Sequence, residues 1–234
     1  MKNDNCNLTN SRFTGAIVFA IVALWFSFAL LMGAEVRYGP APHQPPLALG
    51  LSVVAPIVLF VFAYLRRGAF WAFCQSLDLR FVVAAHLWRI MGIDFILCSA
   101  EGRLPAGFAL PAGIGDMIAG LAAIPMAFGI SSGASAAKRW FVAWNIFGLL
   151  DLVLAVSLGI LHSPSSLGVL VGAGPATRLM GELPRSMVPT FLVPLFILLH
   201  LLALARRREI TAVPAGPKEN DHQIPPIAAA AGNA

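Results

Sequence analysis

Apolar residues occur along this chain in long uninterrupted blocks, without the spacing of an amphipathic helix or strand. The first block, residues 13–32, carries no charged side chain. As an α-helix this block would be about 30 Å long, which is the thickness of the hydrocarbon core of a bilayer. Five similar blocks follow. The pattern therefore predicts an all-α, polytopic membrane protein with six transmembrane helices, at residues 13–32, 47–65, 81–99, 104–130, 140–161 and 187–205.

The segments outside these blocks are short, polar or rich in proline and glycine. Residues 1–12 are expected to form a cytoplasmic N-terminal segment, and residues 206–234 a disordered cytoplasmic tail. Residues 68–79 are aromatic but too short to cross a bilayer, which favours a position in the headgroup region. Residues 162–186 are expected to form a loop, a surface helix or a re-entrant helix. The first block is longer than the apolar core of a signal peptide, so we favour a retained helix over a cleaved leader.

The fourth block contains an unusual number of helix-breaking residues. Prolines stand at positions 105, 111 and 125, among many glycines. Such residues predict that the outer portion of this helix is kinked or partly unwound.

Composition and charge support the membrane class. The chain is 58% hydrophobic and only 12% charged, about half the charged fraction of soluble domains. Its net charge of +5 does not indicate nucleic-acid binding, because the basic residues stand at the ends of the apolar blocks. The partner that this pattern predicts is the lipid bilayer, and the sequence leaves the oligomeric state open.

The distribution of Lys and Arg predicts the orientation. Six crossings put both termini on one side, and that side carries most of the basic residues: Lys2, Arg12, Arg66, Arg67, Arg80, Lys138, Arg139, Arg206, Arg207, Arg208 and Lys218. The opposite loops carry Arg37, Arg103, Arg178 and Arg185. Because the richer side is normally cytoplasmic, both termini are predicted to be cytoplasmic. The abundance of Ala, Gly, Leu and Arg favours a bacterial inner membrane.

Polar residues inside the predicted helices are the candidate functional residues. Arg89, Asp94, Asp116, Asn145 and Asp151 would all lie within the membrane. Such residues usually face the bundle interior and are paired, because charge in the hydrocarbon core costs roughly 2.5–3.5 kcal/mol. The three aspartates lie at about the same depth, with Arg89 about 7 Å nearer the cytoplasm. Arg89 and Asp94 are about 140° apart around one helix, so the partner of Arg89 is expected to be Asp116 or Asp151.

Small residues surround both of these aspartates. Such residues mark the faces where membrane helices pack closely. Around Asp116 they are Ala112, Gly113, Gly120, Ala123 and Ala127, and around Asp151 they are Gly148, Ala155 and Gly159, beside Asn145. The pattern predicts a polar cluster between the third, fourth and fifth helices.

This cluster leaves three functional interpretations open. One arginine cannot neutralise three carboxylates, which favours a centre that handles a proton, a cation or a small polar solute. The first alternative is a structural or accessory membrane protein, in which the cluster only fixes helix packing. The second is a membrane redox or lipid-modifying enzyme.

No catalytic, metal or cofactor site is predicted. Common hydrolase and nucleotide-binding motifs are absent, and the three cysteines have no metal-ligand spacing. His86 and His200 are expected at matched depth near the cytoplasmic side, so axial ligation of a haem by the pair stays open as an alternative. We favour two unrelated packing histidines.

Overall fold

A computed structural model of the chain describes residues 2–35, 38, 44–133 and 135–211. Helices and the turns between them make up these residues, and no strand occurs in them. Within these residues, six helical stretches are long and apolar enough to cross a membrane, as predicted. They are Phe13–Ala34, Leu47–Leu65, Leu79–Ala100, Ala106–Ser131, Ser135–Leu161 and Val188–Ala205.

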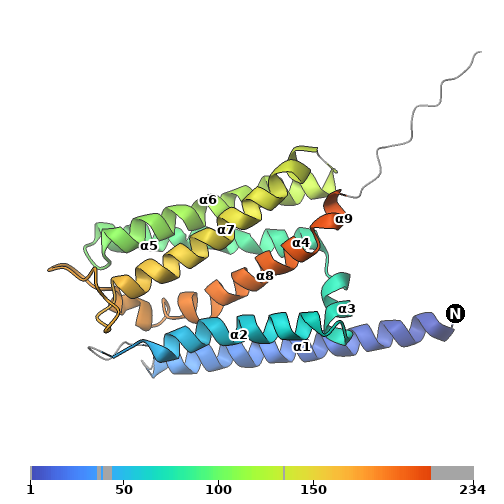
Figure 1. Cartoon of the computed structure of the whole chain (residues 1–234), viewed down its shortest axis with the longest axis horizontal. Helices are drawn as coiled ribbons and strands as arrows, with labels where there is room; N and C mark the ends of the chain where they lie inside the picture. Colours follow the sequence, from blue (N-terminus) through green and yellow to red (C-terminus); the bar gives the residue numbers. More distant parts are fainter. Residues whose placement is uncertain (1, 36–37, 39–43, 134, 212–234) are drawn as a thin grey trace, which may run out of the picture.

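The helices lie roughly alongside one another in two groups (Figure 1). One group contains α4 (Leu79–Ala84), η1 (Ala85–Gly92), α5 (Ile93–Ala100), α6 (Ala106–Ser131), α7 (Ser135–Leu161) and α8 (Val193–Ala205). The other contains α1 (Lys2–Ala34) and α2 (Leu47–Leu65), which run along one side of it. Helix α2 packs against α8 and against η3 (Val188–Leu192), a π-helical turn. Helix α6 packs closely against both η1 and α7, so it lies at the centre of the first group.

The two ends of the bundle are named here by their arginines. The Arg206 end contains the short helix α3 (Ala69–Ser76), the turn α9 (Arg207–Thr211) and the beginning of α1. At the opposite Arg185 end, a loop with one 3-10 turn, η2 (Thr177–Gly181), follows α7. The described chain therefore begins and ends at the same end of the bundle.

The structure corrects the prediction about helix continuity. Helix α6 runs unbroken from Ala106 to Ser131 with Pro111 and Pro125 inside it, so the fourth span is not unwound. The irregular backbone lies in the third span, where η1 is a 3-10 helix. At its last residue, Gly92, a Cβ atom would come within 2.9 Å of the Gly113 carbonyl oxygen. The third span thus tightens where its backbone meets that of α6.

The tail is also ordered further than predicted. Residues 207–211 form α9, and Arg206 is buried, so the expected disorder does not begin at residue 206. The remaining tail, residues 212–234, lies outside the described residues.

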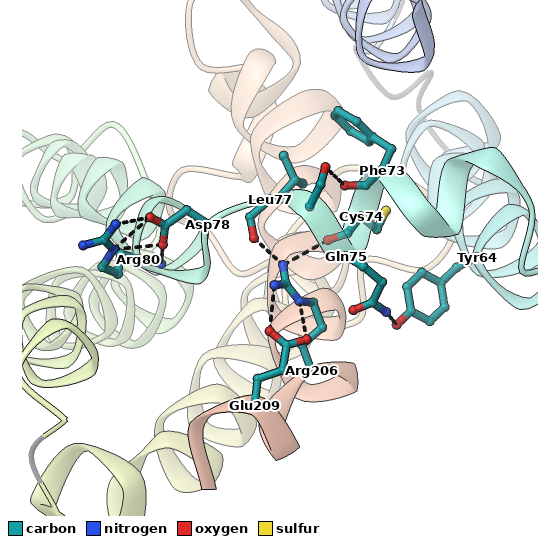
Figure 2. Close-up of polar contacts among 10 residues, drawn as sticks. Tyr64, Phe73, Cys74, Gln75, Leu77, Asp78, Arg80, Arg206 and Glu209 are labelled. Atoms are coloured by element: carbon teal, nitrogen blue, oxygen red, sulfur yellow. Dashed lines mark hydrogen bonds and ion pairs between the residues drawn. The ribbon is translucent and has the colours of Figure 1, made fainter. Parts of the chain in front are cut away.

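Figure 2 shows how Arg206 joins α8 to α3. Its guanidinium donates hydrogen bonds to the carbonyl oxygens of Cys74 and Leu77 and pairs with Glu209. These carbonyls lie at the end of α3, where they lack helical donors. Burial raises the pKa of the Cys74 thiol to about 11, although the nearby Arg206 charge opposes this shift.

We predict that Arg206→Ala loosens this end of the bundle. Two buried carbonyls would lose their donor, and loss of such bonds costs about 1–3 kcal/mol. Thermal unfolding in detergent measures the change, with the exposed Arg139→Ala as control. In a variant with Cys74 as sole cysteine, maleimide labelling at neutral pH should be slow in the parent and faster after Arg206→Ala. Opening this end exposes the thiol and relieves the burial that raises its pKa, and burial is a larger influence on this pKa than the Arg206 charge that is lost. Equal labelling rates would contradict the assignment.

Candidate functional site

The guanidinium of Arg89 lies between two carboxylates in the interior of the bundle. Its side chain is 0% exposed, and its Nε atom donates to Oδ1 of Asp116 at 2.7 Å. Its Nη2 atom donates to Oδ2 of Asp151. Its Nη1 atom lies 3.1 Å from Nε2 of His200 and 3.4 Å from the Gly148 carbonyl oxygen. One side chain from η1 thereby contacts α6, α7 and α8.

The 3-10 geometry of η1 orients this arginine. In a 3-10 helix the side chains at positions i and i+3 lie directly above one another. His86, Arg89 and Gly92 have this spacing, and all three are buried. One face of η1 therefore presents a histidine, an arginine and a glycine to the bundle interior.

Two glycines leave the space that the ion pairs occupy. A Cβ atom on Gly115 would overlap the Asp151 carboxylate. A Cβ atom on Gly148 would overlap the His200 ring and lie 3.0 Å from Nη1 of Arg89. The polar groups can approach one another only because α6 and α7 lack side chains at these two positions.

Hydrogen bonds fix the tautomer of His200. Arginine can only donate, so Nε2 of His200 accepts from Arg89. The ring proton is then on Nδ1, which donates to Oδ1 of Asn145 at 2.9 Å. The amide nitrogen of Asn145 in turn donates to the Phe141 carbonyl oxygen. Both ring nitrogens of His200 are therefore engaged.

His86 stacks against His200 but makes no hydrogen bond from its ring. The ring centroids are 3.9 Å apart, with Trp144 and Phe196 completing the aromatic contacts. His86 is 0% exposed, and neither ring nitrogen has a partner among the described residues. We refer below to Arg89, Asp116, Asn145, Asp151 and His200 as the Arg89 centre, with His86 beside it.

Asp94 lies apart from this centre, contrary to prediction. It accepts hydrogen bonds from Nε and Nη2 of Arg185, at 2.7 and 2.9 Å, at the Arg185 end of the bundle. Its side chain is 43% exposed. Because Asp94 follows Arg89 by five residues, it faces away from the centre. The hydrogen bonds to Asp94 raise the pKa of Arg185.

The structure also changes the interpretation of the histidines. They are not unrelated packing residues, because their rings stack on one another and His200 belongs to the Arg89 network. Axial ligation of a haem does not fit this pair. The stacked rings leave no room for a macrocycle between them, and both nitrogens of His200 are hydrogen-bonded.

A cavity of about 60 Å³ extends from the Arg185 end of the bundle to Asp116. Asp116 is the only charged residue among the described residues that line it. Its walls are mostly apolar and include Phe95, Phe108, Ala155, Met180, Val188 and Val193. A water molecule needs about 10–15 Å³ measured in this way, so several waters fit. Asp116 is thus the residue of the Arg89 centre that faces the cavity.

Arg89 supplies one positive charge for two carboxylates. With both aspartates ionised, the centre would have an excess negative charge in the bundle interior, where an uncompensated ion is costly. The third acidic candidate of the sequence analysis, Asp94, does not change this balance, because it is neutralised by Arg185. Neutrality therefore requires one more positive charge, from a proton or a bound cation.

Sequence reasoning placed Arg89, Asp116, Asp151 and Asn145 together, and the structure brings these four together. It missed the partnership of His200 with Arg89, and the part played by Gly115 and Arg185. Gly115 carried a usable signal, since it directly precedes a buried aspartate. The pairing of Arg185 with Asp94 depends on the path of the loop after α7, which no local pattern specifies.

Comparison with protein families matches residues 45–208 to a family described as a domain of unknown function, DUF8737. The match contains every residue of the Arg89 centre, whereas α1 lies outside it. No curated protein and no solved structure matches the chain.

We predict that Gly115→Ala destabilises the protein by about 3–5 kcal/mol. The added methyl group would displace the Asp151 carboxylate from Arg89, and breaking a buried ion pair has a cost of this order. Gly50→Ala is the matched control, because a Cβ atom there meets nothing within 4 Å. Denaturation in detergent measures both. Equal stability of the two variants would contradict the close packing at Gly115.

Proposed function

The chain is thus a member of the DUF8737 family, and we propose that it binds protons at its Arg89 centre and moves them across a membrane. The single observation that carries this proposal is the imbalance of two buried carboxylates against one guanidinium, with one of the carboxylates lining a cavity. Intramembrane acids in such positions are typical of proton pathways.

A proton suits the missing charge better than a metal ion does. Within the described ranges, no group of three or more His, Cys, Asp or Glu residues could hold a metal. Hard cations require about six or more oxygen ligands, whereas the cavity walls are mostly apolar. The Arg89 guanidinium, 2.7 Å from Asp116, would also repel a cation. A proton bonds to one carboxylate oxygen and needs no further ligands.

A small polar solute has equally few partners in the cavity. The hydroxyl of Thr177 already donates to the Gly159 carbonyl oxygen, and that of Ser163 to the Ile160 carbonyl oxygen. Most of the remaining wall is aliphatic or aromatic. Water is the solute that this space accommodates, and water conducts protons to Asp116.

We further propose that the Arg206 end faces the cytoplasm. The excess of Lys and Arg belongs to the segments at this end, as is usual for cytoplasmic loops. The cavity would then open to the outside, and protons would reach Asp116 from there. The composition of the chain favours a bacterial inner membrane as the location.

A structural role is the second candidate, and one observation favours it. The hydrogen bonds of Arg89 join η1 to α6, α7 and α8, so the same network that could bind a proton also holds the bundle together. A purely structural network would fix the helices without any proton exchange.

Proton flux in liposomes tests the proposed function. The purified protein would be reconstituted with a pH-sensitive dye inside, and a potassium diffusion potential would drive proton entry. Asp116→Asn and Asp151→Asn should each reduce the flux to that of empty liposomes, because the amide keeps the volume but cannot exchange a proton. Asp94→Asn is the matched control and should retain the wild-type rate.

Two results would contradict the proposal. Wild-type protein that conducts no more than empty liposomes would exclude proton movement under these conditions. Wild-type flux in folded Asp116→Asn and Asp151→Asn variants would assign the network to helix packing. Melting temperatures of all variants establish that the compared proteins are folded.

A further inference from the structure

The proton that neutralises the Arg89 centre has two kinds of acceptor within the centre itself. One is a carboxylate. The other is the imidazole of His200, because histidine is the side chain that most readily gains a proton near neutral pH. Nε2 of His200 lies 3.1 Å from Nη1 of Arg89. The contacts of this ring decide which acceptor holds the proton.

The hydrogen-bonding roles of His200 are fixed from both of its sides. Arg89 has only donors, so Nε2 accepts. The Phe141 carbonyl oxygen can only accept, so Asn145 directs its amide nitrogen toward it at 2.8 Å. The amide oxygen of Asn145 then faces Nδ1 of His200 at 2.9 Å and accepts the ring N–H. The other tautomer would oppose two donors at Arg89 and two acceptors at Asn145.

A second proton on the ring has no favourable position. Nδ1 already carries one, so the second would bind Nε2. Its N–H would then face a donor of Arg89, and two positive charges would lie 3.1 Å apart. His86 stacks on the ring and Trp144 contacts it with centroids 5.0 Å apart, so the ring is held in this orientation. His200 is therefore a neutral acceptor.

Helix α7 is built to allow the approach of His200 to Arg89. A Cβ atom on Gly148 would lie 2.2 Å from Nε2 of His200. Asn145, one turn earlier on the same helix, binds the opposite ring nitrogen. One face of α7 thus leaves space for the ring and also fixes its proton.

We propose that His200 is a positioning residue of the Arg89 centre, an inference that rests on the proposed function. Held neutral by Asn145, it accepts from Nη1 of Arg89 and keeps Nε and Nη2 directed at the two carboxylates. Because the ring takes no second proton, the exchangeable proton stays on Asp116 or Asp151.

Few ionisable groups face His200. His86 and Arg89 do so from η1. Asp116 of α6 and Asp151 of α7 are each bonded to Arg89. No residue of η3 is ionisable, and the remaining ionisable groups of α2, α4, α7 and α9 stand at the Arg206 end of the bundle (Figure 1). The pH dependence of proton flux should therefore report the carboxylates.

Two substitutions of His200 in reconstituted protein test the positioning role. His200→Leu removes the acceptor of Nη1, so flux should fall to that of empty liposomes. His200→Gln offers an amide oxygen that can accept from Arg89 but takes up no proton near neutral pH. It should restore flux relative to His200→Leu, with the pH dependence of the wild type. If the imidazole carried the proton, neither variant would conduct.

Two spectroscopic measurements locate the proton without relying on flux. Infrared spectra at neutral pH should show the carbonyl band of a protonated carboxylic acid in the wild type and in His200→Gln. Asp116→Asn should lose this band, because one carboxylate then balances Arg89. In a variant with His200 as sole histidine, nitrogen NMR should show one protonated and one unprotonated ring nitrogen across the pH range of the flux.

The outcomes separate this inference from the proposed function. Absence of wild-type flux, with the carboxylic acid band and a neutral His200 both observed, would overturn proton movement and retain the inferred place of the proton. Wild-type flux with a doubly protonated His200, or with no flux in folded His200→Gln, would overturn the inference alone. Wild-type flux in folded His200→Leu would also overturn it. If neither variant folds, a neutral ring supports the inference and a doubly protonated ring overturns it.

Discussion

The arrangement of this bundle depends on one buried guanidinium. Arg89 is fully enclosed, and an arginine that is not deprotonated in proteins must be neutralised where it lies. Asp116 and Asp151 do so from two different helices, and His200 and the Gly148 carbonyl occupy its remaining side. Removing one partner of such a pair leaves the other charge in an apolar interior without a counter-charge. The positions of four spans are therefore coupled through one side chain.

Close backbone packing is the condition for that coupling. The 3-10 turn of η1 puts Gly92 against α6, and Gly115 and Gly148 leave room for the Asp151 carboxylate and the His200 ring. In a bilayer, helices associate through packing and polar contacts, because lipid is as apolar as their side chains. The glycines and the Arg89 network thus act together. An apolar cluster separates the centre from the Arg206 end of the bundle, whereas the cavity reaches the centre from the Arg185 end.

The Arg89 centre has more carboxylates than guanidinium groups, which distinguishes it from an ion pair that only holds two helices together. A simple ion pair needs one carboxylate for one arginine. Asp94 and Arg185 form such a one-to-one pair at the end of the bundle. The Arg89 centre has a second carboxylate, a cavity that reaches Asp116, and an unbonded histidine on the opposite side. The proposed function rests on the second carboxylate and on the cavity.

The sequence alone determined the class of this protein and the members of its ion cluster. Six apolar blocks specify six helices because each must satisfy its backbone hydrogen bonds within itself, and small residues beside Asp116 and Asp151 indicated which faces meet.

Tertiary structure decided the rest. The separation of Asp94 from the centre, its pairing with Arg185 and the stacking of His86 on His200 all depend on contacts between distant segments. The 3-10 turn in the third span depends on backbone contact with α6, whereas the prolines of α6 were accommodated within a continuous helix. Local patterns cannot specify such features, because their energies arise only when the helices pack.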